Sequence, residues 1–571
     1  MSMKKTLSKL ITQSIALTLA IPHIVFAQTG AQPAVTPKPV VISTPILLEG
    51  YIPADSGPTE SAANAQVKKI FFLIDKGVIQ KYFSKMPPAD QIPAGTIQLT
   101  EKLTGKLLLS PGFIDMHNHV DHAVVPLWDA AKGQYSNRFA WRKEADYKLN
   151  VRGQAVKIKD DDKAAGRSGI TSNGCKVIQY AEMKALLGGV TTIQGIGEAG
   201  NNVCAFGNLI RNVENKADFS VGTDTKISFE VVNPTHGQMF RDYVKPIMRE
   251  KGIGIEEAYA QVPKDVKDKS PFSEFFGKPT LTNLTDDLFG KISAFKKTFD
   301  DMVAVNSGGK NRAFITHLAE GKAIDEFTNG EFQMAKDVGI ARQGMVLIHG
   351  IGLTAEDWKE AKKSEISLVW SPFSNLLLYG ETTNVAAAKQ AGINISLGSD
   401  WSPSGSKTLL DEVKIAKRYL IKKGLDREFT DKDFYEMMTI NAAKALKLED
   451  RLGKLAPGYL ADIVAVPMTS TKNNPYTAIV NSDSSSIKLV IVGGKMAIAN
   501  KAWLQSSDVT EPIVAEATGA CAQLKGQVVV NLDFSLQATI EALRPLVKIL
   551  DGHISCADKT YLSKIDQLFA K

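Results

Sequence analysis

Short apolar runs alternate with helix-like stretches through the middle of the chain, from residue 110 to about residue 445. This alternation is typical of β–α units that build a parallel sheet. Seven runs are predicted strands: 112–116, 190–196, 226–232, 313–316, 345–348, 367–370 and 393–398. An eighth strand is expected near 204–210, where the pattern is ambiguous. Eight parallel strands with intervening helices predict a (β/α)₈ TIM barrel over residues 111–445, an α/β fold.

Two insertions account for the length of this segment, which exceeds the ~250 residues typical of such a barrel. Residues 123–180 are charged, and we expect them to be irregular. Residues 234–310 contain helical stretches broken by Gly and Pro. Because long β–α loops lie over the face where barrel active sites form, both insertions are predicted to shape a substrate pocket.

Both flanks of the barrel have a β-like pattern with glycine-containing turns. Examples are KIFFLID at 69–75, GKLLL at 105–109 and IKLVIVGGKM at 487–496. The flanks are residues 44–110 and 446–503. Residues 504–571 are a predicted C-terminal extension, with one β-like run at 527–532 and helical periodicity after it.

The N-terminus predicts export. Three lysines within the first nine residues precede a mostly apolar stretch, and Ala27 places a small residue where a signal peptidase cuts. The apolar stretch is short for crossing ~30 Å of hydrocarbon, which disfavours a membrane anchor. Residues 1–27 are therefore a predicted signal peptide, and the Pro- and Ala-rich residues 28–43 a flexible segment. The expected location is periplasmic or secreted.

Composition narrows the choice of partner. The 571 residues are 44% hydrophobic, and 68 basic residues stand against 61 acidic ones, which gives a net charge of +7. No concentrated basic block occurs, so nucleic acid is a disfavoured partner and a small-molecule substrate is expected. The sequence leaves a homo-oligomer open.

The four cysteines lie beyond the predicted signal peptide, at Cys175, Cys204, Cys521 and Cys556. An oxidising compartment favours disulfide bonds, and three pairings stay open. We expect at least one disulfide. A cysteine-based metal site is not expected, because no C-x-x-C pair occurs.

Histidines follow several predicted strands. His117 and His119 end the stretch SPGFIDMHNH, where side chains two residues apart point to the same side. His317 ends AFIT, His349 ends GMVLI, and Asp400 ends INISLGS. The carboxyl ends of barrel strands are where catalytic residues gather. Histidine and carboxylate ligands suit zinc or ferrous iron with one position left open.

At these residues the sequence resembles the amidohydrolase superfamily of metal-dependent hydrolases. The matching pieces are PGFIDMHNH, GVTTIQG, FITHLAE, VLIHG, SPFSN, LGSDWSP and PGYLADIVAV, in that order over about residues 100–465. HLAE and SPFSN look most like the one-metal deaminases and chlorohydrolases of the cytosine-deaminase and triazine-hydrolase kind. The resemblance implies that the two flanks build a composite β-sandwich together.

The resemblance also implies roles for individual residues. The implied metal ligands are His117, His119, His317 and Asp400. Asp400 would also take a proton from the attacking water, and His349 would contact that water or the developing oxyanion. Glu320, three residues after His317, matches the glutamate that carries a proton to the leaving nitrogen.

One divalent ion, Zn²⁺ or Fe²⁺, is the expected cofactor, and a second metal stays open. Two-metal branches of the family often use a lysine of strand four to bridge the metals. Lys226 lies at the start of the predicted strand, away from the active face, and Glu230 is a candidate substitute for the bridging residue. We expect hydrolysis of a non-peptide carbon–nitrogen bond in a small cyclic or amidine-like compound. The alternatives are a two-metal cyclic amidase or acyl-amino-acid hydrolase, and an exported binding protein with a decayed metal site.

Overall fold

The computed structural model describes most of the chain beyond residue 43. The described residues are 44–56, 66–128, 133–195, 209–214, 222–223, 240–268, 296–297, 299–301, 303–304, 313–470, 473–505, 508, 510–512, 527–530, 532, 534–547 and 559–570. The predicted signal peptide and the flexible segment at 28–43 lie outside them. Within these ranges, no helix combines the length and the apolar character needed to cross a membrane.

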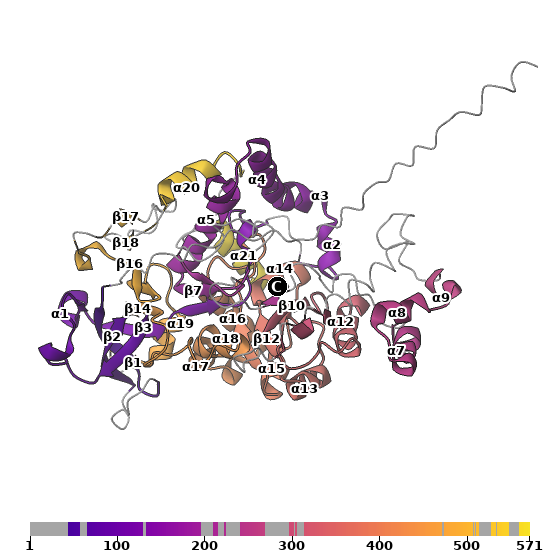
Figure 1. Ribbon diagram of the computed structural model, residues 1–571, viewed down its shortest axis with the longest axis horizontal. Coiled ribbons are helices and arrows are strands. Elements are labelled where there is room, and N and C mark those ends of the chain that lie inside the picture. The colour runs from indigo at the N-terminus through magenta and orange to yellow at the C-terminus, as the bar shows by residue number, and fades with distance from the viewer. Residues whose placement is uncertain are drawn as a thin grey trace, which may run out of the picture. The chain divides into compact units, whose positions relative to one another are not determined.

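Strands from both flanks of the barrel form one ten-stranded sheet (Figure 1). The N-terminal flank supplies β1 (Ile46–Pro53), β2 (Val67–Asp75), β3 (Val78–Phe83), β4 (Ile97–Leu99) and β5 (Leu107–Pro111). The C-terminal part supplies β14 (Ile463–Pro467), β15 (Leu489–Val492), β16 (Lys495–Asn500), β17 (Thr510–Pro512) and β18 (Gln527–Val530). The order is β17-β18-β16-β15-β14-β5-β1-β2-β3, with β4 beside β1.

The two flanks meet where β5 pairs antiparallel with β14. Apolar side chains from both strands, among them Leu109 and Ile463, are fully buried in one hydrophobic cluster with Phe72 of β2. Burying such side chains away from water stabilises the sheet by roughly 1.5–3 kcal/mol each. Chain segments more than 350 positions apart are therefore held in one sheet by a shared core.

The barrel strands follow one another in chain order. They are β6 (Phe113–Asp115), β7 (Val190–Ile193), β8 (Arg211–Asn212), β9 (Gly222–Thr223), β10 (Phe314–Leu318), β11 (Met345–His349), β12 (Ser367–Trp370) and β13 (Asn394–Leu397). Strands β6 to β8 and β9 to β13 form two runs of parallel neighbours. The last strand meets the first, because the Met116 amide donates to the Leu397 carbonyl at 3.2 Å and Asn118 bridges Asp400 in parallel fashion. The (β/α)₈ barrel is confirmed.

The predicted strand positions agree closely with the observed ones for six of the eight strands. The described strand β9 comes a few residues before the prediction at 226–232, which lies outside the described residues. Strand β8 comes directly after the ambiguous run at 204–210. Both differences fall where short strands carry few apolar residues, so hydrophobic pattern alone places them poorly.

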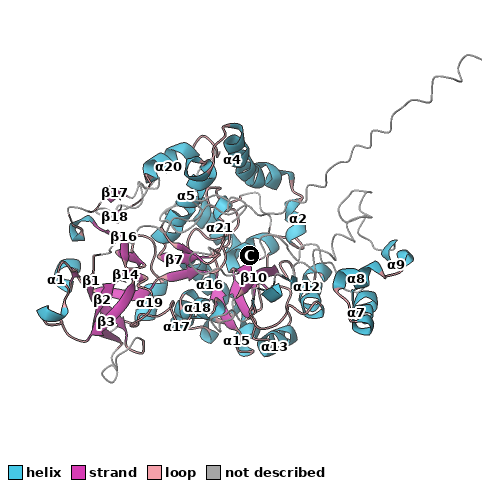
Figure 2. Cartoon of the chain, viewed as in Figure 1, coloured by secondary structure: helices cyan, strands magenta, loops and turns pink. Residues whose placement is uncertain are grey.

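Helices cover the strands of the second half-barrel (Figure 2). These are α12 (Glu326–Asp337), α13 (Ala355–Lys363), α14 (Pro372–Tyr379), α15 (Val385–Gln390), α16 (Leu409–Lys423), α17 (Asp431–Met438) and α18 (Ile440–Ala445). Thr354 and Asp357 form a capping box at the start of α13, which satisfies amide groups that otherwise lack partners. Two short helices lie nearer the sheet, α1 (Glu101–Thr104) and α19 (Pro475–Val480).

The insertion at 123–180 is helical, so the expectation of irregular structure was wrong. It contains α2 (Arg138–Arg142), α3 (Ala145–Tyr147), α4 (Gly153–Ala164) and most of α5 (Asn173–Leu187). Helix α4 buries only Ile158 and Asp162, so its sequence shows no apolar stripe from which a helix could be predicted. The described part of the second insertion contains α7 (Lys245–Lys251), α8 (Ile255–Ala260) and α9 (Lys264–Asp268).

The C-terminal extension packs on the rest of the protein at three places. Strands β17 and β18 lengthen the large sheet. Helix α20 (Leu536–Leu543) packs against α5, and α21 (Lys559–Ala570) packs against α16, where Arg418 pairs with Asp566 at 3.0 Å. Among the cysteines, Cys175 is fully buried on α5, and the other three lie outside the described residues.

The close contact between the first and last barrel strands requires glycine at position 398. A Cβ atom there would lie 2.7 Å from the backbone nitrogen of His117, at the joint between β6 and β13. We expect Gly398→Ala to lower the free energy of unfolding by about 1–3 kcal/mol, the usual cost of overpacking, and to weaken metal retention by moving His117. Thermal melting and metal content measure both effects.

Gly254→Ala is the control, because a Cβ atom there meets open space. This variant should retain metal like the unchanged protein. Its stability should fall only slightly, because Ala is a poorer residue than Gly at the start of α8. A Gly398→Ala protein with unchanged melting temperature and metal content would contradict this account of the joint.

Candidate metal centre

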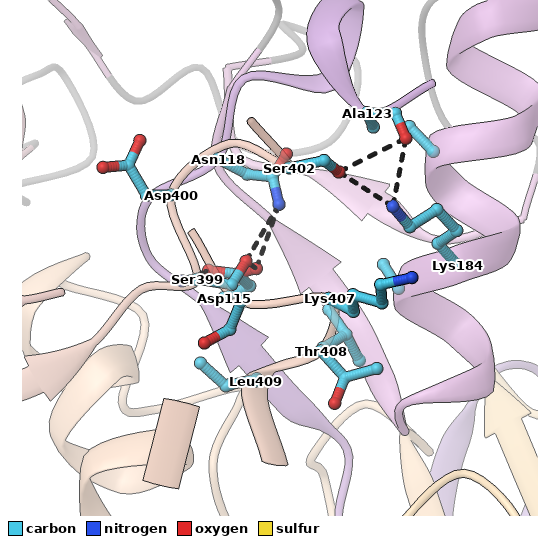
Figure 3. A pocket seen from close by; sticks show the side chains of 14 residues that line it. Asp115, Asn118, Ala123, Lys184, Ser399, Asp400, Ser402, Lys407, Thr408 and Leu409 are labelled. Atoms are coloured by element: carbon cyan, nitrogen blue, oxygen red, sulfur yellow. Dashed lines mark hydrogen bonds between the residues drawn. The ribbon is translucent and has the colours of Figure 1, made fainter. Parts of the chain in front are cut away.

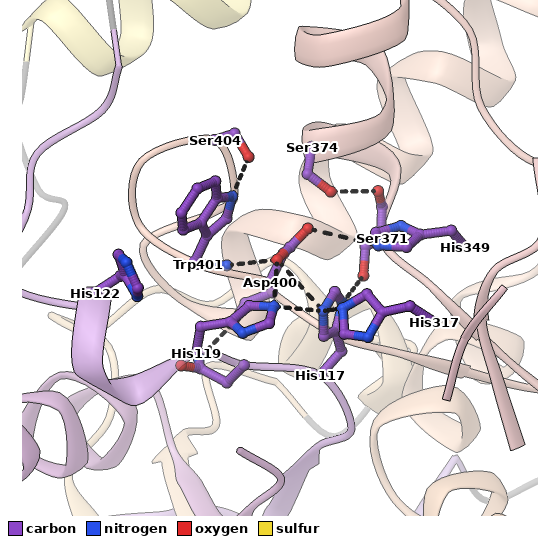
Figure 4. Close-up of polar contacts among 12 residues, drawn as sticks. His117, His119, His122, His317, His349, Ser371, Ser374, Asp400, Trp401 and Ser404 are labelled. Atoms are coloured by element: carbon purple, nitrogen blue, oxygen red, sulfur yellow. Dashed lines mark hydrogen bonds and ion pairs between the residues drawn. The ribbon is translucent and has the colours of Figure 1, made fainter. Parts of the chain in front are cut away.

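The predicted site residues meet at the carboxyl ends of the barrel strands (Figure 4). His117 and His119 follow β6, His317 lies in β10, His349 ends β11, and Asp400 follows β13. His117 is completely buried, whereas the side chain of His119 is about one third exposed. The site is therefore closed on the barrel side and reachable past His119.

Three imidazole nitrogens converge on one point. The Nε2 atom of His117 lies 3.2 Å from that of His119 and 3.0 Å from that of His317. The Oδ1 atom of Asp400 lies 3.4 Å from Nε2 of His117 and 3.5 Å from Nε2 of His119. In a tetrahedral zinc site with bonds of about 2.0–2.1 Å, the ligand atoms lie about 3.3 Å apart. The spacing and the donor types of His117, His119 and Asp400 fit one divalent ion, and the Nε2 atom of His317 faces the same atom of His117.

The histidines are in the protonation state that metal binding needs. Burial and the neighbouring imidazoles lower the pKa of His117 well below its usual value. Burial likewise lowers the pKa of His119 to about 4. Both rings are therefore neutral near pH 7, and a neutral imidazole offers a lone pair to a metal ion. The Nδ1 atom of His117 contacts Ser371 Oγ at 3.0 Å, which leaves Nε2 directed into the cluster.

His349 faces the same point from β11. Its Nδ1 atom lies 2.7 Å from the Asn375 Oδ1, an acceptor, so Nδ1 carries the proton and Nε2 is directed into the site. Burial lowers the pKa of His349 to about 4. The ligand atoms of His117, His317 and His349 also lie close enough together to hold an ion. His349 can thus contact the ion or a reactant beside it.

Two of the site residues have a left-handed backbone, with φ of 71° at His349 and 61° at Asp400. Residues other than glycine adopt this conformation at a cost of order 1–3 kcal/mol, usually at functional sites. The Asp400 amide donates to the His117 carbonyl at 2.8 Å, which fixes the turn. Burial raises the pKa of Asp400.

Helix α14 supports four members of the site from one face. Ser371, just before it, contacts His117, and Asn375 contacts His349. Ser374 hydrogen-bonds to Asp400, and Tyr379 donates to Glu320 Oε1 at 2.6 Å. The spacing of three, four and eight residues places these side chains on one side of a helix. The motif SPFSN was visible in the sequence, but which residue supports which ligand was not.

Glu320 lies beside the histidines, buried at the end of β10. Its Oε2 atom is 3.8 Å from Nε2 of His349 and 3.7 Å from Nη1 of Arg138. Burial alone would raise the pKa of Glu320, but His349 and the permanently charged Arg138 hold it at about 2. The carboxylate is therefore ionised at neutral pH and able to accept a proton. Sequence reasoning missed Arg138, which lies in the insertion expected to be irregular.

A small polar cavity lies behind Asp400 (Figure 3). Asp115 accepts hydrogen bonds there from the Ser399 amide at 3.0 Å and from the Asn118 side chain at 3.2 Å. The Lys184 ammonium donates to the Ala123 carbonyl at 3.0 Å and to Ser402 Oγ at 2.8 Å. These contacts tie β6, the insertion and the loop after β13 together, so Asp115 and Ser402 have structural roles.

Two aromatic rings pack near the cluster. The ring centroids of His122 and Trp401 lie 5.1 Å apart, and His119 is 6.0 Å from Trp401. The candidate bridging residues Lys226 and Glu230 lie outside the described residues.

Comparisons with known proteins agree with this geometry. The profile of the amidohydrolase family matches residues 108–497. A 5-methylthioadenosine/S-adenosylhomocysteine deaminase of Pyrococcus abyssi is 28% identical over 208 residues, which cover 34% of this chain and 48% of that protein. The chain thus spans about half the length of the first curated relatives it matches. A protein of the same description from Teredinibacter turnerae is 23% identical over 441 residues, covering 75% of this chain and 86% of that one.

The fold has solved counterparts. The triazine hydrolase from Arthrobacter aurescens superimposes with a TM-score of 0.55 at 15% identity, covering 88% of this chain and 99% of that one. At this identity the likeness shows the fold alone.

Removing one donor tests the metal centre. We expect His117→Ala to lose the bound divalent ion, because His117 belongs to both groups of side chains that could hold one. We also expect its melting temperature to fall to that of the chelator-treated protein, since an ion that binds only the folded state stabilises it. Elemental analysis and thermal melting are the measurements.

His122→Ala is the matched control, because His122 is a partly buried histidine that contacts Asp121 at 3.1 Å and takes no part in the cluster. It should keep one ion per chain. Equal metal content in the His117→Ala and unchanged proteins would refute the assignment.

Proposed function

The chain belongs to the amidohydrolase family, and we propose that it hydrolyses a carbon–nitrogen bond in a small molecule, by deamination of a purine-like ring. The observation that carries this proposal is the position of Glu320. An ionised carboxylate lies within 4 Å of His349, at the edge of a cluster that fits one divalent ion. Amine departure requires a proton, and this carboxylate can deliver one.

The reaction replaces a C–N bond by a C–O bond and releases ammonia. Water supplies the oxygen atom, one of its protons must reach the leaving nitrogen, and the other remains on the product. Two carboxylates and one imidazole of this chain lie where such transfers occur. When bound, a divalent ion supplies Lewis acidity that lowers the pKa of a water from about 15.7 towards 7.

The protein groups have separate tasks. Oδ1 of Asp400 faces His117 and His119, whereas Oδ2 lies 4.0 Å from Nε2 of His349 and is the atom placed to take the first proton. The Nε2 atom of His349 lies between the carboxylates of Asp400 and Glu320, where it would orient the attacking water. Glu320 accepts a proton and passes it to the leaving nitrogen. Fixed polar groups of this kind lower the barrier without reorganising during the reaction.

The substrate class is supported by the relatives and by the approach to the site. The two relatives described above are deaminases of 5-methylthioadenosine and S-adenosylhomocysteine by name. The ring of Trp401 lies beside His119 and that of His122 lies beside Trp401, and such aromatic surroundings suit a planar heterocycle. We therefore propose an adenine-type nucleoside as the substrate.

Ammonia release tests the function. The zinc- or iron-loaded protein should release ammonia from an adenine nucleoside and should not do so after chelation. Glu320→Gln should keep its metal but lose about 10²–10⁴-fold in turnover, the usual contribution of a proton-transferring group. Glu360→Gln, a change at an exposed carboxylate of α13, should leave turnover unchanged. Full activity in Glu320→Gln would refute its role.

We further propose that the protein is exported and carries a disulfide. The signal-like residues 1–27 support export, and the oxidising compartment that export implies favours a disulfide among the four cysteines. Expression with the N-terminus intact in a bacterium with a periplasm should yield a mature protein that begins at Gln28. The same protein, denatured without reductant, should show fewer than four reactive thiols. A cytoplasmic protein that retains Met1 and titrates four thiols would contradict both statements.

A further inference from the structure

We infer that Arg138 and Tyr379 are positioning residues that fix the Glu320 carboxylate for proton delivery to the leaving group. Arg138 lies on α2, in the insertion after the first barrel strand, and Tyr379 ends α14. The inference rests on the proposed function and assigns part of that function to an insertion outside the barrel.

The two oxygens of Glu320 have different partners. Oε1 accepts a hydrogen bond from the Tyr379 hydroxyl at 2.6 Å. Oε2 lies 3.7 Å from Nη1 of Arg138 and 3.8 Å from Nε2 of His349. A hydrogen bond to one oxygen and an ion pair to the other favour a single orientation of the carboxylate, with Oε2 turned towards the histidine cluster. A carboxylate free to rotate would lose this alignment and much of its catalytic effect.

Arg138 is itself held in place. It is 1% exposed, and its Nη2 atom donates to Glu331 Oε1 at 2.8 Å. Its backbone amide donates to the Glu320 carbonyl at 3.3 Å, and the Lys322 amide donates to the Ser136 carbonyl at 2.7 Å. The insertion therefore pairs with the chain at Glu320 and just after it, around Gly321, which ties the backbone of Arg138 to the residue that it positions.

Tyr379 is held by the same insertion. The indole nitrogen of Trp141, one turn after Arg138 on α2, donates to the Tyr379 oxygen at 2.9 Å. Because that oxygen already accepts a hydrogen bond, the hydroxyl proton is directed to Glu320. Burial and the nearby carboxylate keep the pKa of Tyr379 well above its usual value, so it stays a donor. Helix α2 thus controls both partners of Glu320.

This arrangement predicts an effect that depends on the leaving group. An amino group must be protonated to leave as ammonia, and that proton comes through Glu320. Chloride at the same ring carbon leaves as an anion with the bonding electron pair, and water supplies the new C–O bond and releases a proton. Loss of alignment should therefore slow removal of the amino group far more than removal of chloride.

The experiment compares 6-amino- and 6-chloropurine ribosides with the metal-loaded full-length protein. Tyr379→Phe should lower kcat for the amino compound at least about tenfold and that for the chloro compound less than about threefold, with KM and metal content unchanged. Arg138→Gln should act in the same direction, and Arg138→Lys should recover part of the loss because it keeps the charge. Tyr379→Phe keeps the inference testable if the buried Arg138→Gln protein does not fold.

Tyr476→Phe is the matched control. Tyr476 lies in α19, outside the histidine cluster, and its hydroxyl also donates to a carboxylate, that of Asp55, at 2.5 Å. It should change neither rate. Equal falls in kcat for both ribosides in Tyr379→Phe would overturn the inference and leave the proposed function standing. No turnover of either riboside by the unchanged protein would overturn the proposed function and the inference with it.

Discussion

Three imidazole nitrogens that face one another around the fully buried His117 are the constraint on which the rest of the structure depends. The Nε2 atoms of His117, His119 and His317 lie within 3.0–3.2 Å along two contacts. When two neutral imidazoles face each other, only one of them can donate a hydrogen bond to the other. Without a cation, the lone pairs of the remaining Nε2 atoms would therefore face one another. Burying polar groups without partners costs about 1–3 kcal/mol each, and a divalent ion removes that cost. The barrel, its closure at Gly398 and the left-handed turn at Asp400 all hold this arrangement.

Two layers of structure surround the cluster and act on different members of it. The SPFSN stretch contacts His117, His349 and Asp400, and Tyr379 at the end of α14 contacts Glu320, so this helix supports four residues of the site. The insertion that contains α2 adds a second support, directed at Glu320 alone. The barrel thus fixes the metal donors, and the insertion adjusts the proton-transferring group. Such a division allows the reaction to be tuned without disturbing metal binding.

The sequence predicted the strands that have a clear hydrophobic pattern and the site residues that stand at the ends of those strands. The apolar runs before His317 and His349 are long and regular, so both the strands and the placement of the histidines at their ends could be predicted. Strands β8 and β9 are two residues long and carry no apolar run, which is why their positions were missed. Arg138 could not be identified, since its role comes from a contact with Glu320 across 182 positions and from α2, a helix of five residues that is too short to show a helical period. Long-range contacts of this kind leave no periodic signal.

The most direct test of the metal centre is the X-ray absorption spectrum of the protein loaded with one zinc ion per chain. The account predicts five nitrogen or oxygen ligands at about 2.0–2.2 Å, four from the protein and one from water, with the multiple-scattering signal of three imidazole rings. A sulfur ligand at about 2.3 Å, or a spectrum without imidazole scattering, would contradict it.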